Sequence, residues 1–306
     1  MNAACVVFHI HHMWLGASES RMLHLYESGS FRHGYSYMIC MTYNLDKRRR
    51  QREMAQSYQE FAAYYDRLMA DVDYGVWANY LLELLQSCGV QPEQSILDCA
   101  CGTGELTLRL HKAGYKMTGA DASTHMLEQA AAKARKAGAK IAFVQQQLQK
   151  LSVHKPVSAI TCACDGVNYL LAREDVFAFF QGANHALGDS GVLLFDISSA
   201  YKLEHILGGQ TFGEDEADCT YLWQNCFDPK SRLLEMRLAF FTPDGEGAYR
   251  RFDERHVQRA HEVDELTRLL EEAGFAILGV YDAFTKNAAH NTSERIQFVA
   301  RKTRQV

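Results

Sequence analysis

Two glycines and a carboxylate, set about twenty residues apart, give this chain of 306 residues a ligand-binding pattern. A short apolar run ends in Asp98, a loop of small residues with Gly102 and Gly104 follows, and helical periodicity comes next. Glycines there permit a sharp turn and let a ligand approach the backbone, and the helix start offers free N–H groups. A second expected strand ends in Asp121, whose carboxylate can accept both hydroxyls of a ribose. The spacing therefore predicts a nucleoside site.

The glycine spacing also argues against a dinucleotide as the ligand. Dinucleotide sites use G-x-G-x-x-G, and here Leu106 occupies the third glycine position. The stretch from Asp98 to Gly104 instead resembles the D-x-G-x-G-x-G loop of class I S-adenosylmethionine-dependent methyltransferases. Ala100 stands where that loop has its first glycine.

The resemblance extends from about Tyr58 to Lys302 and is closest to the small bacterial methyltransferases of the methyltransferase-25 type. It includes FAAYYDRLMADVDYGVWANYL, the strand end GADAS followed by Met126, and CACDGVNYLL, in the same order. One position departs from the family: Gln147 replaces an acidic residue that holds the adenine amino group. A glutamine carbonyl can still accept that hydrogen bond. The resemblance implies S-adenosyl-L-methionine as cofactor and a Rossmann-like, doubly wound α/β fold with a mostly parallel seven-stranded sheet.

The resemblance also implies which residues surround the cofactor. The glycines would pass its amino acid and ribose portions, Asp121 would hold the ribose, and Met126 would pack on the adenine. Aromatic rings near a sulfonium gain a cation–π attraction, which adds two aromatic residues from the expected N-terminal helices. The expected cofactor-binding set is Tyr65, Trp77, Ala100, Gly102, Gly104, Asp121, Ala122, Met126, Gln147, Leu148 and Cys164. Core packing is the alternative for the two aromatics, and a carboxylate at a helix N-terminus is the alternative for Asp121.

Methyl transfer is an in-line displacement, so the protein mainly holds donor and acceptor in attack geometry and excludes water. Asp165 and Tyr169 follow the fourth expected strand, where open α/β sheets place the substrate crevice, although either could simply cap the next helix. Glu254, His256 and Gln258 alternate on one face of a later strand, and a histidine near its ordinary pKa could act as general base. The expected catalytic residues are therefore His256, Asp165 and Tyr169, with an exposed, inactive face as the competing interpretation of the later strand.

Alternating strands and helices must position these residues, and that alternation predicts a parallel sheet with helices on both faces. From Tyr201 to Ala260 the period changes to that of strands, which predicts an inserted antiparallel meander at about 209–260. Its expected strands are Tyr221–Phe227, Leu233–Phe241 and Tyr249–Gln258. We expect residues 54–306 to form one methyltransferase domain with this insertion.

Residues 1–53 show no sustained period and end in a basic run at 47–50. We expect an extension that is disordered or absent from the native protein. Adjacent arginine codons resemble a purine-rich ribosome-binding sequence, so Met54 is our hypothesis for the true start. A nuclear signal, a nucleic-acid tail and a histidine metal site are the alternatives for this segment.

Composition narrows the function classes. The net charge of −5 disfavours a dedicated nucleic-acid binder, and no apolar run approaches the ~20 residues of a membrane helix. No signal peptide is evident, which predicts a cytoplasmic protein with no membrane partner, either monomeric or homodimeric. Two Cys-x-Cys pairs, Cys99 with Cys101 and Cys162 with Cys164, could form a thiolate metal site. Their spacing is unlike that of zinc sites and they would overlap the cofactor, so we expect no metal and buried free thiols.

The family resemblance implies an S-adenosylmethionine-dependent methyltransferase, and together with the composition it leads us to expect one that acts on an oxygen, nitrogen or carbon of a small molecule. A tRNA or protein methyltransferase, a regulatory protein that binds the cofactor without catalysis, and a nicotinamide oxidoreductase are the alternatives. The missing third glycine argues against the last of these.

Overall fold

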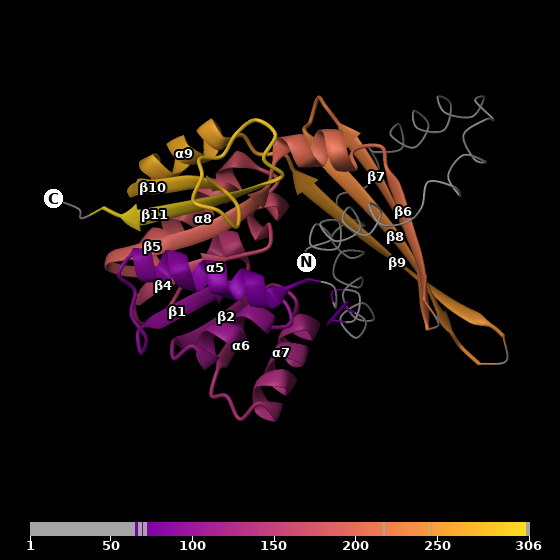
Figure 1. Ribbon diagram of the computed structural model, residues 1–306, viewed down its shortest axis with the longest axis horizontal. Helices are drawn as coiled ribbons and strands as arrows, with labels where there is room; N and C mark the ends of the chain where they lie inside the picture. The colour runs from indigo at the N-terminus through magenta and orange to yellow at the C-terminus, as the bar shows by residue number, and fades with distance from the viewer. Residues whose placement is uncertain (1–64, 67–68, 70–71, 217, 246, 304–306) are drawn as a thin grey trace.

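The computed structural model describes residues 65–66, 69, 72–216, 218–245 and 247–303. Two sheets organise them, one of seven strands and one of four (Figure 1). The expected α/β class, with a mostly parallel seven-stranded sheet and an antiparallel insertion, is confirmed. Our expectations for residues 1–53, for a start at Met54 and for most of a helix over Tyr58–Met69 concern positions outside the described residues.

The seven-stranded sheet has the order β10-β11-β5-β4-β1-β2-β3. Its strands are β1 (Ser95–Cys99), β2 (Lys116–Asp121), β3 (Ala142–Gln145), β4 (Val157–Cys162), β5 (Leu187–Ser198), β10 (Phe275–Asp282) and β11 (Arg295–Lys302). β1 pairs in parallel with both β2 and β4, whereas β11 is antiparallel to β5 and β10. The chain thus winds outward in both directions from β1. Open sheets of this kind bind ligands at the carboxyl ends of the strands beside that switch point.

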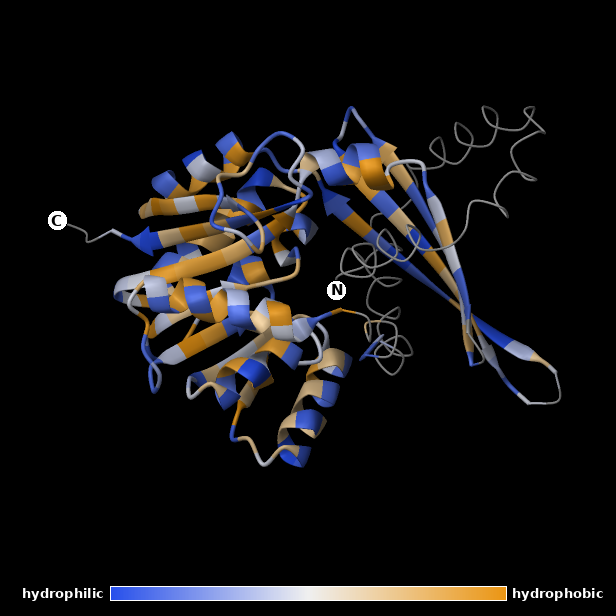
Figure 2. Ribbon diagram, viewed as in Figure 1, coloured by the Kyte–Doolittle hydropathy of each residue, from blue (hydrophilic) through white to orange (hydrophobic). Residues whose placement is uncertain are grey.

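Helices cover both faces of this sheet, because its central strands are apolar on both sides (Figure 2). Leu194 of β5 packs into one apolar cluster with α5 and α6, and its neighbour Phe195 packs into the other with α8 and α9. The helices are α5 (Tyr74–Ser87), α6 (Glu105–Lys112), α7 (Thr124–Lys136), α8 (Arg173–Ala186) and α9 (Val263–Glu272). Short helical turns are η3 (Leu148–Lys150), η4 (Gly166–Tyr169) and η5 (Lys202–Leu207). Among the described residues no helix is long and apolar enough to span a membrane.

The second sheet is antiparallel throughout, in the order β6-β7-β8-β9. Its strands are β6 (Thr211–Glu216), β7 (Cys219–Asp228), β8 (Leu233–Pro243) and β9 (Tyr249–Arg259). The expectation of three strands is wrong, because β6 adds a fourth at the edge. Its sequence TFGEDE is acidic and contains glycine, so it lacks the apolar alternation that marks a strand, and an edge position tolerates such residues. The sheet projects beyond the core and contacts it where β9 meets η4 and β7 meets η5 (Figure 1).

Candidate functional site

The loop between β1 and α6 has a left-handed backbone at three positions. Ala100 and Gly102 both have φ +53° and Gly104 has φ +79°. A Cβ on Gly104 would lie 3.0 Å from the Cβ of Ala130, so glycine is needed there for its conformation and for close packing against α7. No atom lies within 4 Å of a Cβ built on Gly102, which leaves open space on that side of the loop. The loop therefore offers a bare backbone surface to a ligand.

Asp98 holds this loop from beneath and does not face the ligand side. Its side chain is buried, with Oδ2 accepting from Thr107 Oγ1 at 2.5 Å and Oδ1 accepting from Thr161 Oγ1 at 2.8 Å. Burial raises the pKa of this carboxyl to about 6, although both hydrogen bonds act in the opposite direction. One carboxylate thereby ties β1 to α6 and to β4.

Asp121 at the end of β2 faces the loop. Its Oδ2 accepts from the backbone N–H of Gly102 at 2.9 Å, and its Oδ1 accepts from the N–H of Ser123 at 2.8 Å. The Ser123 hydroxyl, in turn, caps α7 by accepting from the N–H of Met126. Each Asp121 oxygen keeps a second lone pair, so the fixed carboxylate can still accept two ligand hydroxyls. Ser123, and not Asp121, supplies the N-cap of α7.

The ends of β2 and β3 bring further expected residues to the same edge. Gln146 N–H donates to the Asp121 carbonyl oxygen at 2.8 Å, and the Gln145 side chain donates to the Ala122 carbonyl oxygen at 3.1 Å. Gln147 is exposed just beyond β3 and Leu148 is half-buried at the start of η3. Met126, one turn into α7, is buried. The structure therefore gathers Asp121, Ala122, Gln147 and Leu148 beside the loop.

The two aromatic candidates have different surroundings. Trp77 is buried in α5, where its ring meets Phe284 edge to face at 4.7 Å between centroids. The guanidinium of Arg295 lies 5.2 Å from the centre of the same ring. Trp77 therefore packs in the core and already faces a cation from the protein, while its expected contact with the cofactor stays a prediction. Tyr65 is buried as well, and its neighbour Asp66 contacts the glycine loop through Thr103.

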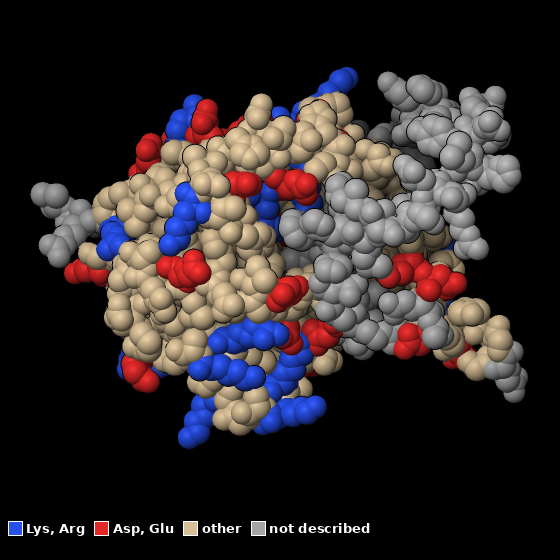
Figure 3. All heavy atoms as spheres, viewed as in Figure 1, with Lys and Arg blue, Asp and Glu red and all other residues tan. Residues whose placement is uncertain are grey.

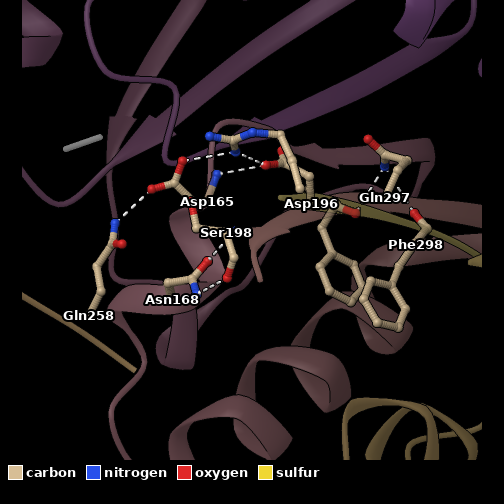
Figure 4. A network of polar contacts seen from close by, with 9 residues as sticks. Asp165, Asn168, Asp196, Ser198, Gln258, Gln297 and Phe298 are labelled. Atoms are coloured by element: carbon tan, nitrogen blue, oxygen red, sulfur yellow. Dashed lines mark hydrogen bonds and ion pairs between the residues drawn. The ribbon is translucent and has the colours of Figure 1, made fainter. Parts of the chain in front are cut away.

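The loop after β4 has a second left-handed segment, formed by residues other than glycine. Cys164 has φ +60° and Asp165 has φ +56°, a conformation that costs about 1–2 kcal/mol per residue. Asp165 is fully buried: its Oδ1 pairs with Arg295 Nη1 at 2.9 Å and its Oδ2 accepts from Gln258 Nε2 at 2.6 Å. Its backbone N–H donates to Asp196 Oδ2, which Arg295 also contacts (Figure 4). The surrounding ion pairs hold the strained loop in place.

This geometry revises the function expected for Asp165. It makes no side-chain cap of η4, and both carboxylate oxygens are held by Gln258 and Arg295. Burial raises the pKa of the neighbouring Asp196 to about 6, while Arg295 opposes the rise. Asp165 thus joins the loop to β9 and β11, and it is suited to positioning the site rather than to accepting a proton from a substrate.

Asn168 in η4 adds hydrogen bonds between the two sheets. Its Nδ2 donates to the Ser198 carbonyl oxygen at 2.9 Å, and its Oδ1 accepts from Ser198 N–H at 3.0 Å (Figure 4). Nδ2 also donates to the Arg259 carbonyl oxygen at 2.9 Å. The end of β5 and the end of β9 are thereby fixed to the same side chain. The position of Asn168 after the fourth expected strand already suggested that it lies near the substrate crevice. The sequence analysis did not identify Arg295 or Asp196 as site residues, because no local spacing marks contacts between such distant strands.

The expected alternation along β9 is confirmed. Glu254, His256 and Gln258 are 2%, 3% and 0% exposed, so an exposed and inactive face is wrong for this strand. An ordinary pKa for His256 is also wrong, since burial lowers it to about 3. The His256 ring is perpendicular to that of Tyr169, with 6.1 Å between centroids. At neutral pH this imidazole is uncharged and suited to hydrogen bonding more than to holding a proton.

The cysteines near the loops are protonated thiols. Burial raises the pKa of Cys99, Cys101 and Cys162 well above the ordinary thiol value. A Cβ on Gly166 would lie 2.9 Å from Cys162 Sγ, so the sulfur fills space against η4. In the part of the chain that the structure describes, no group of three or more His, Cys, Asp and Glu is arranged to hold a metal ion.

Known proteins share this architecture. A family model described as a methyltransferase domain matches residues 96–191. A protein of Geobacillus sp. (strain WCH70), named as a methyltransferase without a stated acceptor, is 39% identical over 80% of this chain and all of its own length. A crystal structure of an S-adenosylmethionine-dependent methyltransferase from Clostridium acetobutylicum ATCC 824 is 33% identical over 81% of this chain and 99% of that one, with a TM-score of 0.73. The sugar N-methyltransferase KedS8 from Streptoalloteichus sp. ATCC 53650 shares the fold at 17% identity, over 79% of this chain and 92% of that one, with a TM-score of 0.65.

Proposed function

Since this chain belongs to the class I S-adenosylmethionine-dependent methyltransferases, we propose that it methylates an oxygen, nitrogen or carbon of a small molecule. The acceptor would lie between the loop after β4 and the inner face of β9. The observation that carries this proposal is the placement of the four-stranded sheet, which meets the core at η4, next to the carboxyl ends of β4 and β1. Open α/β folds bind their substrates at that edge.

The residues present fit S-adenosyl-L-methionine. The open backbone at Gly102 and the two fixed oxygens of Asp121 suit an adenosyl ribose, and Gln147 and Leu148 would lie along the adenine edge. When bound, the cofactor supplies an activated methyl group on a sulfonium. The loop would orient it, and Gly104 would keep α6 and α7 close enough to support that loop. We propose the further cofactor contacts at Tyr65, Trp77, Ala100, Ala122, Met126 and Cys164.

On the acceptor side we propose different functions for the three expected catalytic residues. His256 and Tyr169 would contact the acceptor, with the neutral imidazole of His256 exchanging a hydrogen bond with its nucleophilic atom. Asp165 would act as a positioning residue, because Gln258 and Arg295 occupy its carboxylate. Water exclusion and alignment would then supply most of the rate enhancement.

A nucleic-acid acceptor is the second candidate, since Lys and Arg side chains gather over α6 and α7 (Figure 3). Lys133, one of these basic residues, is engaged with Asp66, Glu105 and Thr103. The net charge of −5 gives the protein no general attraction to a phosphate backbone. We therefore favour a small acceptor.

Two measurements test the proposed function. Calorimetry should detect binding of S-adenosylmethionine and of S-adenosylhomocysteine, and binding of neither would contradict it. The purified protein should transfer a labelled methyl group to a component of a metabolite extract and not to tRNA or protein fractions. Label in either macromolecular fraction would replace the small acceptor, and cofactor binding without any transfer would indicate a regulatory protein.

A further inference from the structure

Lys133 of α7 lies at the centre of a polar cluster below the cofactor loop. Its Nζ is 2.6 Å from Asp66 Oδ2, 2.9 Å from Glu105 Oε1 and 3.0 Å from Thr103 Oγ1. The Thr103 hydroxyl donates to Asp66 Oδ1 at 2.6 Å. An ammonium has three protons, and here each has an oxygen acceptor within reach. We call these four residues the Lys133 cluster.

The Lys133 cluster joins segments that are separate in the chain. Thr103 belongs to the glycine loop, Glu105 begins α6, and Asp66 lies before α5. Thr103 is buried, and the Lys133 side chain is 23% exposed, so the ion pairs are less screened by solvent than those of a free surface. An ion pair whose charged atoms also take part in further hydrogen bonds contributes more to the free energy of folding than an isolated ion pair on the surface.

The Lys133 cluster includes Asp66, whose neighbour Tyr65 is a proposed cofactor contact. Tyr65 is buried in the same apolar cluster as Leu106 of α6 and Met126 of α7. Fixing the Asp66 carboxylate therefore restrains the neighbouring Tyr65, whose side chain is buried in that cluster. The loop itself has separate supports in Asp98 and Asp121, which do not depend on Lys133.

We propose that Lys133 is a positioning residue for methyl transfer: by binding Asp66 and Thr103 together, it holds Tyr65 and Asp66 against the loop that binds the cofactor. Cofactor binding and the placement of these two residues are then coupled, so each strengthens the other. This inference goes beyond the proposed function and rests on its cofactor site, but not on the identity of the acceptor.

The test compares Lys133→Met and Asp66→Asn, singly and together, with Lys136→Met as control. Lys136 is exposed one turn later on the same helix, so its substitution removes the same charge outside the cluster. Calorimetry measures the Kd of S-adenosylmethionine, and thermal unfolding measures Tm with and without it. Each single variant should weaken binding about tenfold, the double variant should be no weaker than either, and Lys136→Met should match the wild type.

Contrary results separate the possibilities. A lowered Tm with a Kd within twofold of the wild type would reduce Lys133 to a structural residue and overturn the inference, as would additive losses in the double variant. If Lys133→Met does not fold, Asp66→Asn decides by the same criteria. Lys133→Arg, which keeps the charge, should recover part of the lost affinity. A wild type that binds neither S-adenosylmethionine nor S-adenosylhomocysteine would overturn the proposed function and this inference together, whereas normal wild-type binding with unchanged variants overturns this inference alone.

Discussion

The glycine loop and the loop after β4 lie at neighbouring strand ends, but different kinds of contact hold them. Around the glycine loop Asp121 binds Gly102, 19 positions away, and Asp98 binds Thr107 and Thr161, 9 and 63 positions away. The loop after β4 depends on Asp165, which binds Gln258 and Arg295 at separations of 93 and 130 positions. Backbone conformation defines the glycine loop, whereas buried charges between two sheets define the loop that we propose to line the acceptor pocket.

The two loops also accommodate their left-handed residues differently. In the first, Gly102 and Gly104 adopt positive φ without a steric penalty, and Ala100 alone bears one. In the second, both left-handed residues, Cys164 and Asp165, do so at a cost of about 1–2 kcal/mol each. The ion pairs of Asp165 and Asp196 with Arg295 offset that cost. The comparison teaches that more backbone strain is stored in the loop that we propose to line the acceptor pocket.

The largest effect on stability should follow from removing the cation that pairs with the loop after β4. Arg295→Met leaves the carboxylates of Asp165 and Asp196 buried without their partner, which should lower the free energy of unfolding by about 3–5 kcal/mol. Urea denaturation measures this loss. Arg173→Met, which removes an exposed ion pair with Glu272, is the control and should cost less than about 1 kcal/mol. If both variants lost the same free energy of unfolding, the buried ion pairs of the loop after β4 would be no more important than an exposed pair.

On the cofactor side the largest effect should concern affinity. Asp121→Ala removes the acceptor of the Gly102 and Ser123 N–H groups and the proposed ribose contacts. We expect S-adenosylmethionine binding to weaken by roughly 2–3 kcal/mol, or about 30- to 150-fold, as measured by calorimetry. Asp189→Ala removes an exposed carboxylate and serves as control. An unchanged Kd would show that Asp121 only shapes the loop.

A pH-dependent effect should follow from Asp98. Its pKa of about 6 in the folded protein exceeds the value of 3.8 expected when unfolded, so it stabilises the fold below pH 3.8 and that stabilisation is lost as the pH rises through 6. Asp98→Asn removes this dependence. From pH 4 to pH 8 the unfolding free energy of the variant should therefore gain about 2–3 kcal/mol relative to the wild type. Denaturant melts at both pH values test this, and a constant difference between the two proteins would contradict it.

The smallest effect compares Ala100 with Gly102, which share a φ of +53°. Ala100→Gly removes the left-handed penalty but increases the entropy of the unfolded chain, so it should stabilise the fold by at most about 1 kcal/mol. Gly102→Ala is the matched reverse change, with open space around the new Cβ, and should destabilise by about 1 kcal/mol. Thermal unfolding should show a raised Tm for Ala100→Gly and a lowered Tm for Gly102→Ala. The same sign for both variants would show that φ does not govern this loop.

The difference between the two loops also explains what the sequence could predict. The glycine loop, Asp121 and the alternation of strands and helices follow from local patterns, and these parts of the fold were predicted correctly. Arg295 lies at the start of the last strand without any motif, and its contact with Asp165 arises only when β11 pairs beside β5. The lowered pKa of His256 was missed for a similar reason, because alternation along β9 identifies a face and not the burial of that face.

Trp77 and β6 mark two further limits of sequence patterns. An aromatic residue at helical spacing can face a ligand or the core, and the spacing alone did not predict that Phe284 and Arg295 pack on Trp77. The strand β6 has acidic residues and glycine because an edge strand pairs on one side only. Its backbone pairing with β7 determines its structure more than its side chains do.

The attachment of the four-stranded sheet at one end has an evolutionary consequence. Asn168 and Gln258 fix the carboxyl end of β9, while the turn that joins β8 to β9 lies 11 residues away, about 35 Å at the rise of an extended strand. Insertions, deletions or a grafted peptide tag at that turn would leave the methyl-donor loop undisturbed. Lineages can therefore diversify the outer half of this hairpin while inheriting an unchanged donor site.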